Sequence, residues 1–124
     1  MHRKAFTLIE IMVVVAIIGL IAVMAFPLYG KVRRSAARAT VKSDGAQIAA
    51  AANRYYMEKS VTIAPVSELL GATSGYVKAL SPGNTINVAS LLMDSAFTFE
   101  IGNPFLTIGG LTFDNEGRVI ADPY

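Results

Sequence analysis

The hydrophobic positions of this chain follow three successive patterns. In the first, from Phe6 to Tyr29, apolar residues are almost continuous and Glu10 is the only charged residue. As a helix, this run is about 36 Å long, enough to cross the hydrocarbon core of a bilayer. We predict a membrane-spanning helix whose weak points are Gly19 and Pro27. A kink is expected upstream of Pro27, because proline lacks an amide hydrogen and clashes with the preceding turn.

The second pattern, from Gly30 to Lys59, continues the helix, because it is rich in alanine and contains no proline. One stripe at helical spacing is predicted to pack against a C-terminal domain: Val41, Ile48, Ala52 and Tyr55. A second stripe, which we call the alanine stripe, consists of Ala36, Ala39, Ala46 and Ala50. The alanine stripe is either a contact surface between subunits or part of one wide core face. Tyr55 and Tyr56 are predicted core anchors.

The third pattern consists of short segments that follow the helix. Residues 60–65 bring in β-branched residues and proline, so the helix is expected to end at Lys59. Phe6 to Lys59 then form one kinked helix about 80 Å long. The stretch "PVSELLG" is a candidate short helix closed by Gly71, and "SPGN" at Ser81–Asn84 is a predicted turn.

Strand patterns occupy the last part of the chain. In "FTFEI", Phe97, Phe99 and Ile101 alternate with polar residues, which predicts a strand with one buried face. The stretch "GLTFDNEGRVIAD" predicts a hairpin whose turn is formed by residues 114–117. The expected fold class is therefore α+β: a long kinked N-terminal helix, half of it transmembrane, with a small antiparallel sheet of three or four strands packed on it.

Composition excludes several kinds of chemistry. The 124 residues allow one small domain beside the hydrophobic segment, and the chain contains no cysteine. A disulfide framework, a thiolate metal site and a thiol nucleophile are thereby excluded. The formal net charge of +2 falls to zero without Arg3 and Lys4, which precede the hydrophobic run. Net charge therefore gives no reason to expect a nucleic-acid partner.

A local cluster of positive charge follows the hydrophobic run. This basic belt consists of Lys31, Arg33, Arg34, Arg38 and Lys42. We interpret it as a solvated helix face at the boundary of lipid headgroups, in preference to a nucleic-acid site.

Glu10 needs an explanation, because an acid in hydrocarbon costs at least a few kcal/mol. One interpretation is that it lies close enough to the membrane edge to reach headgroups. The other is that it pairs with the positively charged α-amino group of a neighbouring copy, freed if the chain is cut just before Phe6. That pairing would require subunits to stack with an axial offset, and would thus select a register.

The segment "KAFTLIEIMVVVAIIGLIA" resembles the N-terminal signature of the type IV pilin family, which includes the pseudopilins of type II secretion. The resemblance implies a leader, Met1–Ala5, that is cleaved between Ala5 and Phe6, followed by N-methylation of Phe6. Glu10 then falls at the fifth position of the processed chain, where the family has its glutamate. Ala5 is a departure, because glycine is usual before the cut.

The resemblance also implies a function and a set of partners. The chain would be a structural subunit of a type IV pilus-like filament or of a type II secretion pseudopilus. Its partners would be copies of itself, prepilin peptidase, an inner-membrane assembly platform, other minor pilins and the lipid bilayer. The residues implied in assembly are Thr7, Glu10, Gly19 and Pro27.

Four segments follow from this interpretation: the leader 1–5, a transmembrane or filament-core helix 6–30, its amphipathic continuation 31–59 and a globular region 60–124. The family topology implies a single-pass inner-membrane precursor with its C-terminal region outside the cytoplasm, and then a periplasmic or cell-surface filament. The basic belt outweighs the leader charges, so the positive-inside rule alone favours the reverse orientation. We follow the family topology, because the leader can be cut only where its peptidase works.

No catalytic constellation is present, since the one histidine, His2, lies in the leader. We therefore expect no enzyme and no cofactor. Asp114, Asn115 and Glu116 could contact calcium, which related pseudopilins often bind, but a plain turn is the favoured interpretation of these residues.

Two rival functions remain. The chain could be a monomeric membrane-anchored binding module, whose sheet captures a ligand. It could also be a DNA-uptake pilin, for which the distal region offers only Lys78 and Arg118 as basic contacts.

Overall fold

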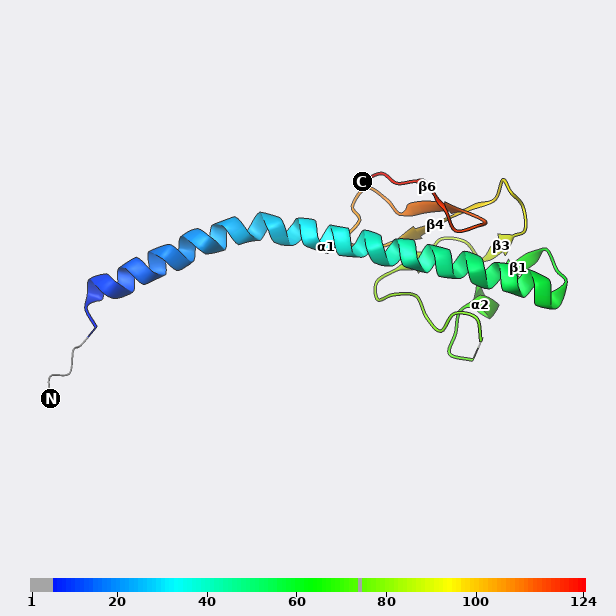
Figure 1. The fold of residues 1–124 in the computed structure, drawn as a ribbon, viewed down its shortest axis with the longest axis horizontal. Helices are drawn as coiled ribbons and strands as arrows, with labels where there is room; N and C mark the ends of the chain where they lie inside the picture. Colours follow the sequence, from blue (N-terminus) through cyan, green and yellow to red (C-terminus); the bar gives the residue numbers. More distant parts are fainter. Residues whose placement is uncertain (1–5, 74) are drawn as a thin grey trace. The chain divides into compact units, whose positions relative to one another are not determined.

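The computed structural model describes residues 6–73 and 75–124. Its elements, labelled in Figure 1, are α1 (Leu8–Lys59), β1 (Ile63–Pro65), α2 (Val66–Leu69), β2 (Thr85–Ile86), β3 (Ser90–Leu92), β4 (Thr98–Gly102), β5 (Leu111–Asp114) and β6 (Val119–Ala121). One long helix followed by short antiparallel strands confirms the predicted α+β class. The predicted leader, Met1–Ala5, lies outside the described residues.

Helix α1 begins two residues after the predicted start and ends at the predicted residue, Lys59. Pro27 lies inside the helix. Ser60 follows with a φ of 53°, the left-handed conformation in which many helices end. The chain divides into two compact units, Met1–Arg33 and Arg34–Tyr124. In the first unit, the apolar part of α1 has a mean hydropathy of 2.9 and no buried residue, so by length and composition it could cross a membrane.

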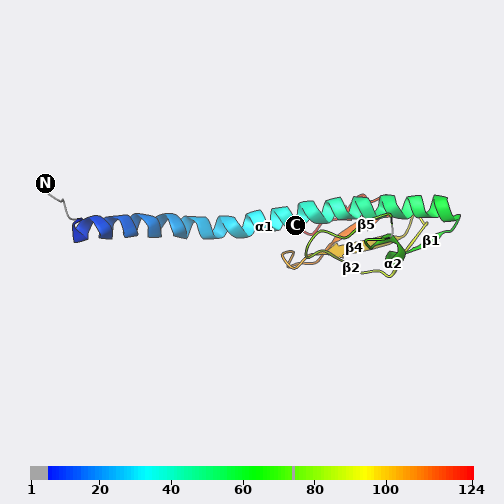
Figure 2. The ribbon, with the colours of Figure 1, turned by 90° about the horizontal axis from the view of Figure 1, so that it is seen from below.

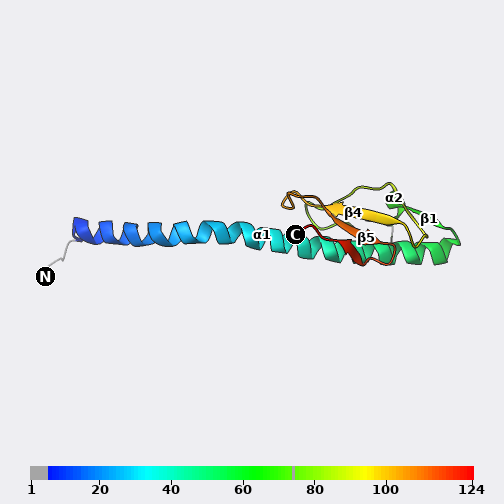
Figure 3. The same cartoon turned by 90° about the horizontal axis from the view of Figure 1, so that it is seen from above.

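In the second unit, α1 buries one face. The predicted core stripe is confirmed, because Val41, Ile48, Ala52 and Tyr55 are all buried. The alanine stripe is exposed along its whole length, so its interpretation as part of the core face is wrong. At 3.6 residues per turn the two stripes lie on opposite sides of the helix. Figures 2 and 3 show the sheet along only one side of this part of α1.

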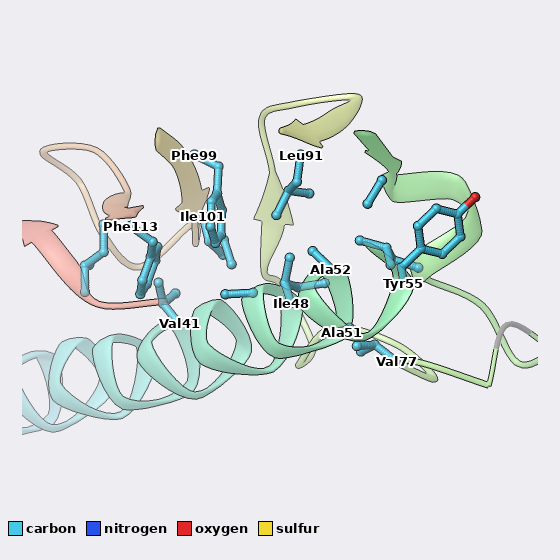
Figure 4. Close-up of a cluster of buried hydrophobic side chains, with 14 of the residues drawn as sticks. Val41, Ile48, Ala51, Ala52, Tyr55, Val77, Leu91, Phe99, Ile101 and Phe113 are labelled. Carbon is cyan, nitrogen blue, oxygen red and sulfur yellow. The ribbon is translucent and has the colours of Figure 1, made fainter. Parts of the chain in front are cut away.

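Two small sheets cover that face. Strands β2, β4, β5 and β6 form a four-stranded antiparallel sheet in the order β2-β4-β5-β6, within the predicted number of strands. Phe99 and Phe113 pair across β4 and β5 and stack with ring centroids 5.4 Å apart, in the core of Figure 4. The predicted hairpin is confirmed, with the Gly117 amide donating to the Asp114 carbonyl over 3.0 Å. The separate pair β1-β3 was not predicted from the sequence.

Two glycines allow the sheet to lie this close to the helix. A Cβ atom on Gly45 would lie 2.3 Å from Cε1 of Phe113, so the aromatic ring rests directly on the helix backbone. Gly117 has a φ of 80°, and a Cβ there would lie 2.9 Å from both Cα of Ala46 and Cβ of Ala49. The position of the hairpin on α1 therefore depends on missing side chains at both contacts.

A buried carboxylate fastens a loop to the same helix. Asp44 accepts hydrogen bonds from the Ser81 amide at 2.7 Å, the Ser81 hydroxyl at 2.9 Å and the Asn84 side-chain amide at 2.7 Å. The Asn103 side-chain amide donates in turn to Asn84. The turn predicted at Ser81–Asn84 is confirmed, with Gly83 at a φ of 87°. Both oxygens of Asp44 are thus satisfied, as burial of a charge demands.

Replacing Gly45 with alanine should destabilise the second unit by about 1–3 kcal/mol, the usual cost of overpacking a close-packed core. In an open helix the same change is stabilising, so the sign isolates the contact with Phe113. Urea unfolding of the full chain in non-ionic detergent, followed by tyrosine near-UV circular dichroism, measures the effect.

The matched control is Ala50→Ser on the exposed alanine stripe, which should change stability by less than about 0.5 kcal/mol. Adding Phe113→Leu to Gly45→Ala should recover part of the loss, because the smaller side chain makes room. A Gly45→Ala variant as stable as the parent chain would contradict the packing described here.

Candidate functional site

The first candidate site is the beginning of α1, where Thr7 and Glu10 bond to each other in both directions. The backbone amide and the hydroxyl of Thr7 each donate to Oε2 of Glu10 over 2.8 Å. The Glu10 amide donates back to the Thr7 hydroxyl oxygen over 3.4 Å. Because α1 begins at Leu8, Thr7 is the N-cap and Glu10 the third helical residue. This is a capping box, which satisfies backbone donors that a helix start leaves unpaired.

Glu10 therefore has an intrachain partner, whereas the sequence analysis considered only headgroups and a neighbouring chain. The T-x-x-E spacing ahead of an apolar run is itself the signature of a capping box and could have revealed the contact. The negative charge also lies at the positive end of the helix dipole. Within the described residues, hydrogen bonds reach only Oε2 of this carboxylate, so Oε1 remains available to another donor.

An apolar recess adjoins that carboxylate. It has a volume of about 360 Å³ and is lined by Phe6, Ile9, Glu10, Val13 and Val14. Phe6 is 80% exposed. The arrangement combines a carboxylate oxygen with an apolar surface that has no intrachain cover, which suits the end of another apolar helix bearing a positive charge.

The other predicted assembly residues lie along the same helix. A Cβ on Gly19 would meet no atom within 4 Å, so the backbone there is open to close approach by a second helix. Pro27 lies in the helix interior. Ala5, the predicted residue before the cut, lies outside the described residues, so the cleavage site remains an expectation.

The basic belt divides into two groups with different roles. In the second unit, Arg38 and Lys42 both form ion pairs with Asp122, the latter at 3.3 Å. In the first unit, Lys31 is exposed, and the Arg33 guanidinium lies over the Tyr29 ring, 5.4 Å from its centroid. Part of the belt therefore holds the C-terminal tail, a role that the sequence analysis missed because the two ends of the contact are 84 residues apart.

Hydrogen bonding to Arg38 lowers the pKa of Asp122 below its usual value. Tyr124 continues the attachment of the tail, because its hydroxyl accepts from the amide of Ile108 at 2.6 Å and donates to the carbonyl of Gly109 at 3.1 Å. The last residues are thus held to α1 by charges and to the loop before β5 by a phenol.

The turn considered for calcium is organised by an arginine. Asp114 accepts from the amides of Glu116 and Arg118 and from Nε of Arg118, at 3.0, 2.8 and 2.8 Å. Hydrogen bonding to Arg118 lowers the pKa of Asp114. Glu116 pairs with the same guanidinium at 3.0 Å. Among the described residues, no group of three acidic, histidine or cysteine side chains is arranged to hold a metal ion.

A polar recess of about 410 Å³ lies at the far end of α1, with Tyr55, Lys59, Glu68 and Tyr76 among its lining residues. Tyr55 and Tyr76 meet edge to face, with ring centroids 5.6 Å apart. Their hydroxyls donate to Glu68 and Glu58 respectively. Tyr55 and Tyr56 are both buried, which confirms them as core anchors.

Comparison with known proteins points in one direction. Residues 1–26 match the family model of the prokaryotic N-terminal methylation motif. The chain is 28% identical over 116 residues to the type IV major pilin protein PilE1 of Neisseria gonorrhoeae, an alignment covering 86% of this chain and 51% of that protein. The chain thus spans about half the length of this curated relative. No solved structure matches. Together the two matches support the type IV pilin family, a structural family.

Acid should weaken the tail attachment through Asp122. A carboxyl group whose pKa is lowered on folding stabilises the fold above its unfolded pKa, and this contribution is lost as the pH falls through the folded value. In an Asp122→Asn variant, the loss of stability below about pH 4 should therefore be smaller than in the parent chain, with lower stability at neutral pH.

Urea midpoints across the acid range measure this difference. Asp94→Asn is the control, because Asp94 has no ion pair within the described part of the chain. Identical acid profiles for the parent and Asp122→Asn chains would show that the ion pairs with Arg38 and Lys42 contribute nothing.

Proposed function

We propose that this protein is a structural subunit of a type IV pilus-like filament, assembled through the first half of α1. Prepilin peptidase cuts between Ala5 and Phe6, and Phe6 is methylated. The subunit then waits as a single-pass inner-membrane protein with its C-terminal unit outside the cytoplasm. An assembly platform extracts it into a filament, together with other minor pilins.

One observation carries this proposal: an apolar helix with no buried residue begins at a capped glutamate inside a methylation motif. The exposed apolar side chains of the first unit require lipid, or the same segment of neighbouring subunits, as their surroundings. Lipid is the cover before assembly and packed helices are the cover afterwards. A filament core needs no catalytic group.

Glu10 would connect the two states. The capping box holds one carboxylate oxygen against Thr7 and leaves Oε1 for the amino group of a neighbour's Phe6. A charge pair in a low-dielectric core is strong only when both partners meet at hydrogen-bond distance. The pair would thereby select the axial offset between subunits, and the recess beside Glu10 would receive the neighbour's apolar end.

The relative named as a major pilin favours a surface pilus over a short secretion pseudopilus. The exposed alanine stripe offers a second helix surface where subunits can approach closely. The rival interpretation, a monomeric anchored binding module, would use the polar recess near Tyr76 and would need neither processing nor Glu10.

Mass spectrometry of the N-terminal peptide tests processing. We expect a methylated peptide beginning at Phe6, abundant in filaments sheared from whole cells. The same processed peptide confined to the membrane fraction would favour a pseudopilus or a minor subunit. An intact peptide beginning at Met1 in every fraction would reject the filament proposal in favour of the anchored module.

Two substitutions of Glu10 separate its cap from its charge. Glutamine can still accept the Thr7 hydrogen bonds, whereas valine cannot. If the charge pairs with a neighbour, Glu10→Gln and Glu10→Val should both enter the membrane but reduce sheared filament by about tenfold or more, the scale of breaking a buried pair. Thr7→Val, which loses the hydroxyl but retains the charge, should reduce filament less. Normal filament yield from Glu10→Gln would contradict the pairing.

A further inference from the structure

The basic belt contains charge that the proposed function does not explain. Positive residues immediately after a membrane span normally remain in the cytoplasm, yet the proposed topology puts these residues outside it. Arg38 and Lys42 have a structural reason, since both hold Asp122. Arg33 lies in the other unit, close to the end of the apolar run, and needs a separate explanation.

The surroundings of Arg33 form a continuous stripe on one side of the helix. Its guanidinium lies over the ring of Tyr29, one turn earlier. Tyr29 in turn closes an apolar recess of about 320 Å³ that is lined by Ala22, Ala25, Phe26 and Tyr29. Residues spaced by three, four and seven positions share one helix face, so the recess leads directly to the guanidinium.

We propose that this stripe is a binding site for one anionic phospholipid. The guanidinium of Arg33 binds the phosphate, and an acyl chain lies in the recess between the small side chains of Ala22 and Ala25. Tyr29 lies at the junction, where amphipathic rings prefer the headgroup level. The proposal rests on the proposed membrane-anchored precursor and adds the class of lipid that it selects.

Charge complementarity favours this occupant over another apolar helix. A planar guanidinium offers two parallel N–H donors to a phosphate, a geometry that lysine lacks. A basic side chain near an anionic surface is stabilised enough to change lipid affinity about fivefold. Zwitterionic lipids also carry a phosphate, but their own ammonium group offsets its charge. The site should therefore distinguish phosphatidylglycerol from phosphatidylcholine.

The test is native mass spectrometry of the full chain in non-ionic detergent with equal amounts of phosphatidylglycerol and phosphatidylcholine of matched acyl chains. We expect about a fivefold preference for one phosphatidylglycerol adduct. Arg33→Gln should abolish the preference, and Arg33→Lys should retain only part of it. Ala25→Leu, which fills the recess without changing charge, should weaken binding of the adduct.

Lys31→Gln is the matched control, because it removes the same charge at nearly the same depth from another face of the helix. Lys78→Gln removes a charge in the second unit. Both should retain the preference. An equal loss in Lys31→Gln and Arg33→Gln would mean diffuse attraction to anionic surfaces and would overturn the site.

Three further outcomes are decisive. Displacement of the lipid by inorganic phosphate alone would identify a free-anion site and overturn the lipid proposal. A dimer that excludes lipid adducts would identify the occupant as a second copy of the chain. If the chain stays in vesicles after alkaline extraction but shows no lipid preference, this inference fails alone. If alkali releases the chain, the membrane anchor of the proposed function fails.

Discussion

The second unit depends on the contact between a bare stretch of helix backbone and an aromatic ring. Gly45 has no side chain, so Phe113 can rest against α1 and bring β5 with it. Phe113 stacks on Phe99, which brings in β4, and the hairpin turn at Gly117 rests on the next helical turn. A sheet held this close leaves little room for side chains between the layers, which is why alanine dominates the buried helix face.

Helix α1 solves the problem of burial in two ways along its length. In the second unit, one face is covered by sheet and the opposite alanine stripe is exposed. In the first unit, no residue of the apolar segment is buried within the chain, so its cover must come from outside. The two halves therefore have different patterns: a one-sided stripe where a sheet binds, and apolar residues on all sides where lipid or other helices surround the segment.

Sequence patterns predicted the helix end at Lys59, the strand around Phe99 and the hairpin closed by Gly117, because each depends on neighbouring residues. They could not predict contacts between distant residues. Asp44 looks like an ordinary polar residue of a helix until Ser81 and Asn84 are folded onto it. The division of the basic belt depends likewise on Asp122. The capping box is a different case, since the spacing of Thr7 and Glu10 was visible and only its meaning was overlooked.

The attachment of the tail has a consequence for how this fold responds to its surroundings. A chain without cysteine fastens its last residues through Asp122 and the phenol of Tyr124. Such a fastening forms without an oxidant or an isomerase, and it re-forms spontaneously after each opening. Its strength follows the proton and salt concentrations of the medium rather than its redox potential. The tail of this protein is thus a reversible clasp, responsive to the same ionic conditions that a secreted surface meets.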